Sequence, residues 1–558
     1  MSQRTIVVLG GALAGPTAAA RAREIDEHAR ILLIERGERV SYAVCGLAYH
    51  LSGEVGALDE LDRERGAFFQ SVYQIEVWTG TEATALDPAA KTLTVRRTGQ
   101  SGVSSVAWDA LVVALGAASR APDVPGLEGT NVRMLRTLDD LAAVAGALRA
   151  GGRRVTVLGG GPLGIEAADG LVRGGAEVTL VEKEASLLPR FGRQASAAAR
   201  RALERAGARV HTGVTVAGVE TDGGRVTTLA LSAGGTLKTD FVVVAVGLAP
   251  RTELLARAGA RVAADGTLLV DERARTSLDG VWACGVCVST PQALTGAPAW
   301  WPQGAIADKT AQVAGANAAG GEARLAPALG SMLLRAGDTT VGRTGLSAAE
   351  ADAALGRADV GVTTVHASTH DGYFPGARTL LVQAVWQRAS GRLLGVEVAG
   401  AAGVDKRIDA AAGAVAGGLT VEHLAGLDFG YAPPYSSARD PLNVVATVAA
   451  AERAGLAWPI TPKLLNERGA GVQLVDVRAA GERGGTIAGA LAIPLEELRA
   501  RGGELDRTRP VVAFDATGRR AYLAARILRQ AGFGDVQHLA GGLASWELLG
   551  LPRAGDVS

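Results

Sequence analysis

The residue best suited to chemistry in this sequence is Cys45, in the stretch Ser41-Tyr-Ala-Val-Cys45-Gly-Leu-Ala-Tyr49, ahead of a helix-like segment. A cysteine at a helix N-terminus faces unpaired backbone N–H groups and the positive end of the helix dipole, so its thiolate is favoured and its reactivity rises. Most free cysteines instead behave as small buried hydrophobes. Cys45 taken alone fits either role, and the flanking sequence must decide between them.

A glycine-rich turn precedes this stretch and predicts a dinucleotide-binding fold. The apolar run 5–9 ends in Gly10-Gly-Ala12-Leu-Ala-Gly15, an alanine-rich helical stretch follows, and a second apolar run, 30–34, ends in Glu35. The first glycine permits a tight turn, the last lets the helix pack close to the strand, and the terminal acid is spaced to accept from a ribose hydroxyl. Alanine replaces the middle glycine and still lets the backbone approach a pyrophosphate. The candidate cofactor-binding residues here are Gly10, Ala12, Gly15, Glu35 and Ser41.

The same pattern recurs in the second quarter of the chain. The run 154–158 leads into Gly159-Gly-Gly161-Pro-Leu-Gly164, and the run 176–181 ends in Glu182. Glu182 can accept from a free 2′-hydroxyl and would repel a 2′-phosphate, which favours NADH, although the adjacent Lys183 leaves NADPH possible. Two such folds predict two cofactors. The candidate residues of this second site are Gly159, Gly161, Gly164 and Glu182.

Further along the chain the pattern becomes specific to one family. The runs 110–116 and 241–247 are typical of buried parallel strands, and a third unit contains Cys284-Gly285-Val286. The order resembles the flavin-dependent pyridine nucleotide-disulfide oxidoreductases, in which a nicotinamide domain interrupts the flavin domain and a dimerisation domain follows. This resemblance implies FAD as a cofactor and adds Gly116, Gly285 and Val286 to its candidate ligands.

The cysteine stretch resembles one branch of that family. It is similar to the single-cysteine active site of the coenzyme A-disulfide reductases, and the segments 372–376, 404–409 and 431–440 match that branch's dimerisation domain. The resemblance covers nearly all of residues 1–450. It implies that Cys45 attacks a small disulfide or persulfide, and that NAD(P)H, through the flavin, then reduces the mixed disulfide or persulfide on Cys45. Coenzyme A is one candidate substrate thiol.

The same resemblance assigns roles to other residues. Tyr373 and Tyr431 would reach Cys45 across the interface of a homodimer, where a phenol can donate to a developing thiolate or protonate a leaving thiol. Arg23 and Tyr49 are the candidate substrate-binding residues. His50 stands where the glutathione-reductase-like branch has a second cysteine, so that dithiol mechanism is excluded.

Several positions depart from the branch and keep alternatives open. The branch usually has asparagine before the cysteine and proline three residues after it, where this chain has Val44 and Ala48. Glu24 replaces the second of two arginines that help relatives to hold the phosphates of coenzyme A. Val286 replaces an aspartate that, in relatives, forms a hydrogen bond with the ribityl chain of the flavin. A flavin-dependent NADH oxidase, or an enzyme that modifies sulfur in a larger metabolite, is one alternative. A flavoprotein scaffold without activity is another. Leu13, where related oxidases and peroxidases usually have a histidine, weakens the peroxide alternative.

The last hundred residues resemble a rhodanese domain. The segments 472–478, 485–494 and 539–546 follow the order of that family's strands and turns. After the strand 511–514 the family has a cysteine that carries a persulfide, and this chain has Asp515. The loop keeps Gly518 and Arg520 but has lost its nucleophile, so we expect no thiosulfate sulfurtransferase activity.

The composition indicates which partners, cellular compartment and metal sites to expect. The 57 basic and 57 acidic residues balance, which gives no indication of nucleic acid or an anionic membrane as partner. The chain shows no long apolar run or signal-peptide pattern, and its three cysteines cannot form a disulfide framework, so we expect a cytoplasmic protein. Cys284 and Cys287 have a metal-like spacing but no second pair, and no metal site is predicted.

The sequence therefore predicts an α/β protein with two Rossmann-like dinucleotide-binding domains, an α+β dimerisation domain and a C-terminal rhodanese-like α/β domain. The predicted boundaries are 1–118 and 241–322 for the two parts of the FAD-binding domain, 119–240 for the NAD(P)H-binding domain, 323–448 for the dimerisation domain, 449–461 for a linker and 462–558 for the rhodanese-like domain.

Overall fold

The computed structural model describes residues 3–62 and 66–554. The described residues of Met1–Ala185 and Ala206–Ala328 form one compact unit, and those of Ser186–Arg205 and Leu329–Ser558 form a second. Each unit contains helices and two five-stranded sheets, so the prediction of an α/β protein is confirmed. In this described part of the chain, no helix combines the length and the apolar character needed to cross a membrane.

The first unit contains the same β–α–β arrangement twice. Its two five-stranded sheets, ordered β19-β7-β1-β2-β3 and β12-β11-β10-β16-β9, are parallel throughout. The strands of the first sheet are β1 (Thr5–Leu9), β2 (Arg30–Ile34), β3 (Ile75–Trp78), β7 (Ala110–Val113) and β19 (Val281–Ala283). Those of the second are β9 (Val132–Met134), β10 (Arg154–Leu158), β11 (Glu177–Glu182), β12 (Arg209–Thr212) and β16 (Phe241–Val244). The central strands β1 and β10 lead through their glycine turns into α1 (Ala14–Ile25) and α5 (Pro162–Arg173).

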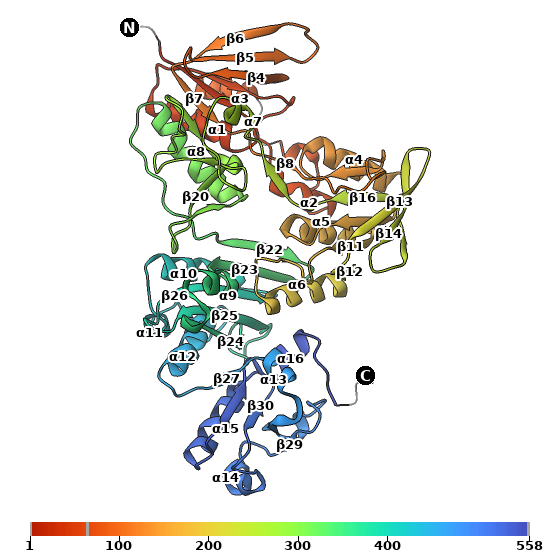
Figure 1. Ribbon diagram of the computed structural model, residues 1–558, viewed down its shortest axis with the longest axis vertical. Helices are drawn as coiled ribbons and strands as arrows, with labels where there is room; N and C mark the ends of the chain where they lie inside the picture. Colours follow the sequence, from red (N-terminus) through yellow and green to blue (C-terminus); the bar gives the residue numbers. More distant parts are fainter. Residues whose placement is uncertain (1–2, 63–65, 555–558) are drawn as a thin grey trace. The chain divides into compact units, whose positions relative to one another are not determined.

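The first sheet is covered on both faces, which explains why its strands are continuous apolar runs. Helices α1 and α8 (Gly304–Ala318) lie side by side against one face (Figure 1). They approach so closely that a Cβ on Gly315 would lie 2.2 Å from the carbonyl oxygen of Ala18. The other face packs against the antiparallel strands β4 (Thr81–Asp87), β5 (Thr92–Arg97) and β6 (Val103–Ala107). The small residues of this alanine- and glycine-rich chain are what allow two helices to share one face.

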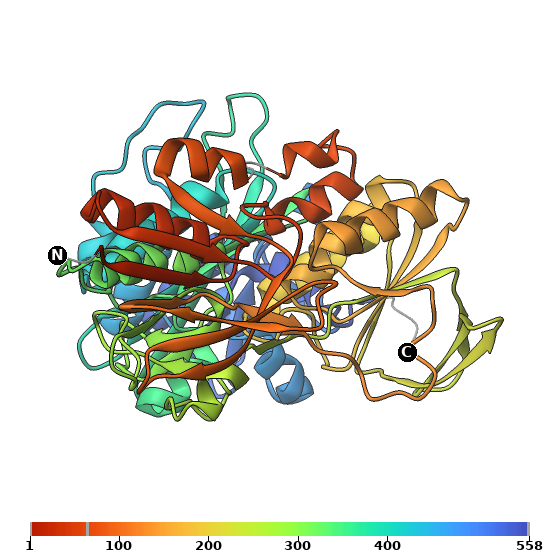
Figure 2. The same ribbon diagram turned by 90° about the horizontal axis from the view of Figure 1, so that it is seen from above.

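The second sheet carries α5 and has an antiparallel extension. Strands β13 (Val216–Asp222) and β14 (Arg225–Leu231) pair with each other, and β14 pairs with β15 (Thr236–Lys238). In Figure 2 they form the yellow-green projection beside the sheet. Their apolar side chains share a core with those of β10, β11 and β16, so they cover one face of the sheet.

The second unit contains an antiparallel and a parallel sheet (Figure 1). The antiparallel sheet has the order β22-β23-β26-β25-β24, and its strands are β22 (Met332–Ala336), β23 (Thr339–Gly345), β24 (Val360–Ser368), β25 (Thr379–Gln387) and β26 (Leu393–Gly400). Helices α10 (Val404–Ala416) and α12 (Pro441–Arg453) pack against this sheet, and α6 (Arg193–Ala206), apart from its last residue, belongs to the same unit. The parallel sheet has the order β27-β31-β30-β28-β29, with β27 (Pro459–Ile460), β28 (Gln473–Asp476), β29 (Leu491–Ala492), β30 (Val511–Phe514) and β31 (Val536–Leu539). Its helices include α13 (Pro462–Arg468), α14 (Leu498–Arg501), α15 (Arg519–Gln530) and α16 (Gly542–Leu548).

The predicted linker 449–461 is wrong at both ends. Helix α12 continues to Arg453, because its alanines favour helix and Ala449 is fully buried near Trp386. At the other end, Pro459 and Ile460 pair with β31 and so belong to the parallel sheet. The segment outside both elements is therefore only 454–458.

Candidate active site

The two glycine turns have nearly the same geometry. Gly10 and Gly159 adopt φ angles of +102° and +106°, in the left-handed region that glycine tolerates. A Cβ on Gly15 would lie 1.7 Å from the carbonyl oxygen of Gly10, and one on Gly164 would lie 1.9 Å from that of Gly159. The tight turn and the close approach of helix to strand therefore require these four glycines, as the sequence predicts.

The middle positions of the two turns differ. A Cβ on Gly161 would meet no protein atom within 4 Å, so this side of the turn is open to an approaching phosphate. In the first turn Ala12 adds a methyl group at that position. The second turn thus leaves room for a pyrophosphate at the start of α5.

The acidic residues at the ends of β2 and β11 are held in place by similar hydrogen bonds. Glu35 accepts hydrogen bonds from the backbone N–H groups of Gly11 and Gly37, at 2.5 and 2.6 Å. Glu182 accepts from the N–H groups of Gly160 and Glu184, at 2.5 and 2.7 Å. Each carboxylate is fixed beside its glycine turn, with oxygen lone pairs that suit a ribose hydroxyl.

The remaining FAD candidates gather around the first turn. Gly285 has φ +80°, and a Cβ on it would lie 2.8 Å from that of Ala14 in α1. The Ser41 N–H donates to the carbonyl of Gly11 at 2.7 Å, which ties the cysteine stretch to the turn. Gly116 adopts φ +67°. The first glycine turn, Glu35 and the segment around Gly285 thus form one cradle that fits FAD.

Val286 is the exception in this cradle. Its side chain is half-buried and packs against the core under α1 and α8, and its carbonyl accepts from the indole N–H of Trp300 at 2.8 Å. A valine has no polar atom for the ribityl chain, so the protein's contribution here is reduced to apolar packing and backbone.

Cys45 lies in a single 3-10 turn, Val44–Gly46, directly before the short helix α2 (Leu47–Leu51). All three cysteines are described, and Cys45 alone is exposed. A Cβ on Gly304, the first residue of α8, would lie 3.8 Å from both Cys45 Sγ and Leu13 Cδ2. The thiol therefore lies near the starts of α1 and α8, next to the FAD cradle.

The predicted preference of Cys45 for the thiolate stays a prediction, and the surroundings of the thiol in the protein without its cofactors oppose it. Partial burial raises the pKa of the Cys45 thiol above its usual value, the negative charge of Glu166 raises it further, and the positive charge of Arg136 opposes the rise. Helix α2 has only five residues, so its dipole is weak. Burial is therefore the main influence on the pKa of this thiol, and the charges of Glu166 and Arg136 are secondary.

The two predicted substrate-binding residues have other partners. The guanidinium of Arg23 is buried and donates to the backbone carbonyls of Asp26, Glu27, Tyr73 and Gln74, so it closes the end of α1. This use of its donors argues against the predicted role in holding phosphates. The other candidate, Tyr49, is half-buried, and its hydroxyl donates to Glu166 at 3.4 Å.

The other cysteines and His50 have structural roles. Cys284 and Cys287 are fully buried, and burial raises the pKa of both thiols, that of Cys287 to about 11. They therefore stay protonated and inert. His50 Nδ1 lies 3.0 Å from the carbonyl oxygen of Val55, in the turn after α2. Across residues 3–62 and 66–554, no three histidine, cysteine or acidic side chains are grouped as metal ligands.

In the second unit, Tyr373 and Tyr431 lie together on an exposed loop surface. The Tyr431 hydroxyl donates to Asp371 at 2.9 Å, and hydrogen bonds with Asp371 and then Tyr373 raise the pKa of Tyr431. The phenol is therefore kept neutral and able to donate. Cys45 belongs to the other unit, so its meeting with these tyrosines stays a prediction.

In the rhodanese-like domain, Asp515 fills its own loop. Its buried carboxylate accepts from the N–H groups of Gly518 at 2.7 Å and Ala521 at 3.2 Å, with longer contacts to those of Thr517 and Arg520. These are the donors that would otherwise face an anion. Asp515 thus stands in place of the nucleophilic cysteine, and its carboxylate also fills the ring of N–H groups where an anion would bind.

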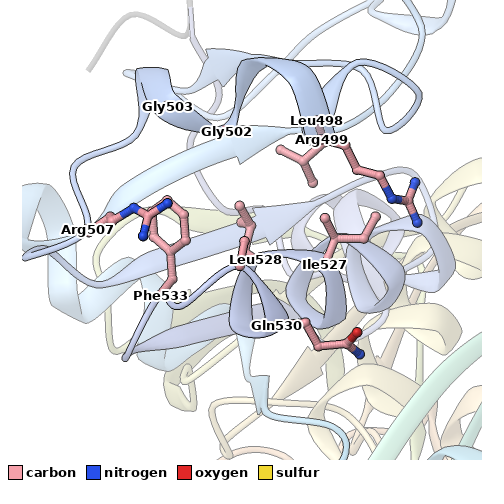
Figure 3. A pocket seen from close by; sticks show the side chains of 10 residues that line it. Leu498, Arg499, Gly502, Gly503, Arg507, Ile527, Leu528, Gln530 and Phe533 are labelled. Carbon is pink, nitrogen blue, oxygen red and sulfur yellow. The ribbon is translucent and has the colours of Figure 1, made fainter.

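A separate cavity of about 320 Å³ lies at the far end of α15 (Figure 3). The residues that line it are Leu498, Arg499, Gly502, Gly503, Arg507, Ile527, Leu528, Gln530, Ala531 and Phe533. The guanidinium of Arg507 lies 5.3 Å from the centre of the Phe533 ring. The lining includes neither a nucleophile nor Asp515, so the cavity is distinct from the altered loop.

Comparison with known proteins agrees with this architecture. Residues 4–305 match the model of the pyridine nucleotide-disulphide oxidoreductases, residues 336–442 match their dimerisation domain, and residues 461–549 match a rhodanese-like domain. The chain therefore belongs to the pyridine nucleotide-disulphide oxidoreductases, a family that is FAD-dependent and uses NAD(P)H. The predicted family, fold and cofactors are confirmed.

Some individual members of this family are similar to the chain over most of its length. Over 452 residues, 80% of this chain and 98% of the relative, the sequence is 30% identical to the NAD(P)H coenzyme A polysulfide/persulfide reductase of Pyrococcus horikoshii. An NAD-dependent persulfide reductase from A. fulgidus is 32% identical with a TM-score of 0.92, over 97% of this chain and 100% of that one. Reduced Bacillus anthracis CoADR-RHD is 29% identical with a TM-score of 0.93, over 98% of each chain.

Sequence analysis missed two charged residues that affect Cys45 and one that binds Tyr431. Arg136 lies in the segment before α4 (Leu138–Arg149), Glu166 lies on α5, and Asp371 lies in a loop. Arg136 and Glu166 are far from Cys45 in the chain and belong to no motif that names them. Asp371 stands two residues before Tyr373, and only its contact with Tyr431 shows its role.

Proposed function

We propose that this protein is an FAD-dependent NAD(P)H oxidoreductase that reduces a small-molecule disulfide or persulfide through a covalent adduct on Cys45. The observation that supports it most is the position of Cys45, an exposed thiol beside the FAD cradle in a unit that also holds the nicotinamide turn. Coenzyme A, named in the P. horikoshii relative, is the first substrate thiol to test.

The chain's own residues account for the sulfur chemistry. The Cys45 thiolate attacks one sulfur of the substrate, a Cys45–sulfur bond forms, and the substrate's S–S bond breaks to release a thiolate. Bound FAD supplies the two electrons, taken from NAD(P)H, that cleave the adduct. Because Cys284 and Cys287 are buried, no other cysteine of this chain can resolve the adduct.

The surroundings of Cys45 favour this reaction over reduction of oxygen or peroxide. Leu13 lies at the start of α1, where a Cβ on Gly304 would touch both it and the thiol. An apolar side chain there offers no proton to a peroxide oxygen. The neutral phenol of Tyr431, delivered across a homodimer by the dimerisation domain, would instead donate a hydrogen bond to a leaving thiolate.

The C-terminal domain has no sulfurtransferase role in this proposal. Asp515 is a poor nucleophile toward sulfane sulfur, and it uses the N–H groups that would bind thiosulfate. We infer that the domain was retained for docking or stability. Its helix α16 bears Ser545, whose hydroxyl contacts Gln194 of α6 and His366 of β24 at 2.8 and 2.9 Å.

The test is anaerobic NADH oxidation by the purified yellow protein, with coenzyme A disulfide, coenzyme A persulfide or cystine as the acceptor. We expect turnover with at least one small disulfide or persulfide and its loss in Cys45→Ser, with flavin content unchanged. Oxygen reduction without disulfide turnover would support the oxidase alternative. A colourless protein that releases no flavin on denaturation would support the scaffold alternative.

A further inference from the structure

One segment of the second unit lies, in the sequence, between two strands of the nicotinamide domain. Residues 186–205, which include most of α6, belong to the second unit, whereas β11 and β12 on either side of them pair in the sheet that carries the second glycine turn. The segment begins two residues after Glu184, whose backbone N–H donates to the candidate ribose acid Glu182 at 2.7 Å. Contacts that hold this segment therefore also hold the chain next to the nucleotide site.

The start of this segment is a turn that the antiparallel sheet holds in place. Leu188 is buried at a φ of +50°, a left-handed conformation that is unfavourable for a residue other than glycine. The backbone N–H of Gly192 donates to both carboxylate oxygens of Glu397 on β26, at 2.9 and 2.8 Å. The guanidinium of Arg343 on β23 donates to the carbonyl of Arg190. Because such a turn persists only where its surroundings fix it, these contacts give the segment one defined position on the sheet.

Helix α16 of the rhodanese-like domain holds the next part of the segment. Ser545 is fully buried, and its hydroxyl donates to the side-chain oxygen of Gln194 on α6 at 2.8 Å. The same hydroxyl lies 2.9 Å from Nε2 of His366 on β24, and because it has only one proton, the histidine must donate to it. The guanidinium of Arg201 on α6 also donates to the carbonyl of Glu547. One buried hydroxyl of α16 thus joins α6 to the antiparallel sheet.

We propose that the rhodanese-like domain is a clamp for the NAD(P)H site: through Ser545 it keeps α6, and with α6 the adjoining loop that carries Glu182, in the position that binds the nucleotide. This role needs no thiolate. Two backbone N–H groups at the start of α16 donate to the carbonyls of Asp515 and Ala516, both at 2.9 Å, so the closed loop supports the helix that makes the contact. The inference takes only the NAD(P)H site from the family and nothing from the chemistry at Cys45.

The test combines hydrogen exchange of the intact flavoprotein with its affinity for ADP-ribose, which carries the ribose and pyrophosphate of NADH but cannot reduce the flavin. Ser545→Ala takes a buried partner from Gln194 and His366, so peptides from residues 190–205 should exchange about tenfold faster. The dissociation constant of ADP-ribose, measured by isothermal titration calorimetry, should rise about threefold, as expected if the competent position is then populated about one third of the time.

Gln194→Ala removes the same contact from the side of α6 and leaves α16 unaltered, so it should reproduce both changes, and the double variant should add little to either. Thr461→Ala is the matched control, since its hydroxyl caps α13 of the same domain by accepting from the N–H of Leu464 at 3.3 Å. It should match the wild type in both measurements. If either single variant at the contact keeps wild-type exchange or wild-type ADP-ribose affinity, the inference is overturned. No disulfide enters these measurements, so lack of reductase turnover would refute the proposed function alone.

Discussion

Replacing Asp515 by alanine should open the loop that the carboxylate now closes. Asp515 has two short hydrogen bonds, from the N–H groups of Gly518 and Ala521, in a site where it is only 2% exposed. Charge-assisted bonds of this kind contribute about 1.5–3 kcal/mol each, and water entering the loop recovers part of that sum. A net loss of about 3 kcal/mol in local stability corresponds to about 150-fold faster exchange of these amides.

Hydrogen exchange of the intact protein, read by mass spectrometry over peptides from the loop and the start of α15, measures this loss. Asp515→Asn keeps one acceptor oxygen and should accelerate exchange by about tenfold, between the wild type and alanine. Asp506→Ala is the matched control, since the carboxylate of this exposed aspartate accepts from the backbone N–H and the hydroxyl of Thr508 in its own turn. If Gly518 and Ala521 exchange at wild-type rates in Asp515→Ala, the carboxylate does not hold the loop, and that part of the reasoning is refuted.

Other predictions test the remaining charged sites. The intact protein should form no thiocyanate from thiosulfate and cyanide, because Asp515 offers no thiolate; formation above a heat-inactivated control would contradict this. Asp371→Asn should lower the pKa of Tyr431, measured by phenolate absorbance against Tyr431→Phe, and an unchanged titration would show that Asp371 does not hold the phenol. Burial raises the pKa of Glu452 to about 8, so the folded protein keeps a proton that the unfolded chain loses. Relative to Glu452→Gln, the wild type should therefore lose up to about 5 kcal/mol of stability as the pH rises from about 4.5 through about 8, and parallel plots of stability against pH for the two proteins would exclude this.

Local patterns in the sequence were enough to predict much of the fold. The strands β1, β2 and β10 are apolar runs bounded by glycine turns, and they form at the predicted residues. The effect of Asp515 was predictable for the same reason, since the donors that it meets follow it within six residues. Strand, turn and acid each depend on neighbours close in the chain.

The errors concern interactions between distant segments. Arg23 was assigned to a substrate, but two of its four carbonyl partners, on Tyr73 and Gln74, lie about fifty residues away. The ionisation of Cys45 was assigned to a helix dipole, but burial is the largest influence on its pKa, and the charges of Glu166 and Arg136 come from other elements of the fold. Periodicity and motif spacing do not report which side chains a fold brings together. These contacts could be identified only from the structure.

The central claim is that Cys45 forms a covalent bond with the substrate's sulfur. Its most direct test is the mass of the Cys45 peptide after anaerobic incubation of the oxidised protein with coenzyme A disulfide or persulfide, without NAD(P)H. We predict a peptide heavier by one substrate thiol or one sulfur atom, reversed by NADH and absent in Cys45→Ser. An unmodified Cys45 in a protein that nevertheless turns over these substrates would contradict the account.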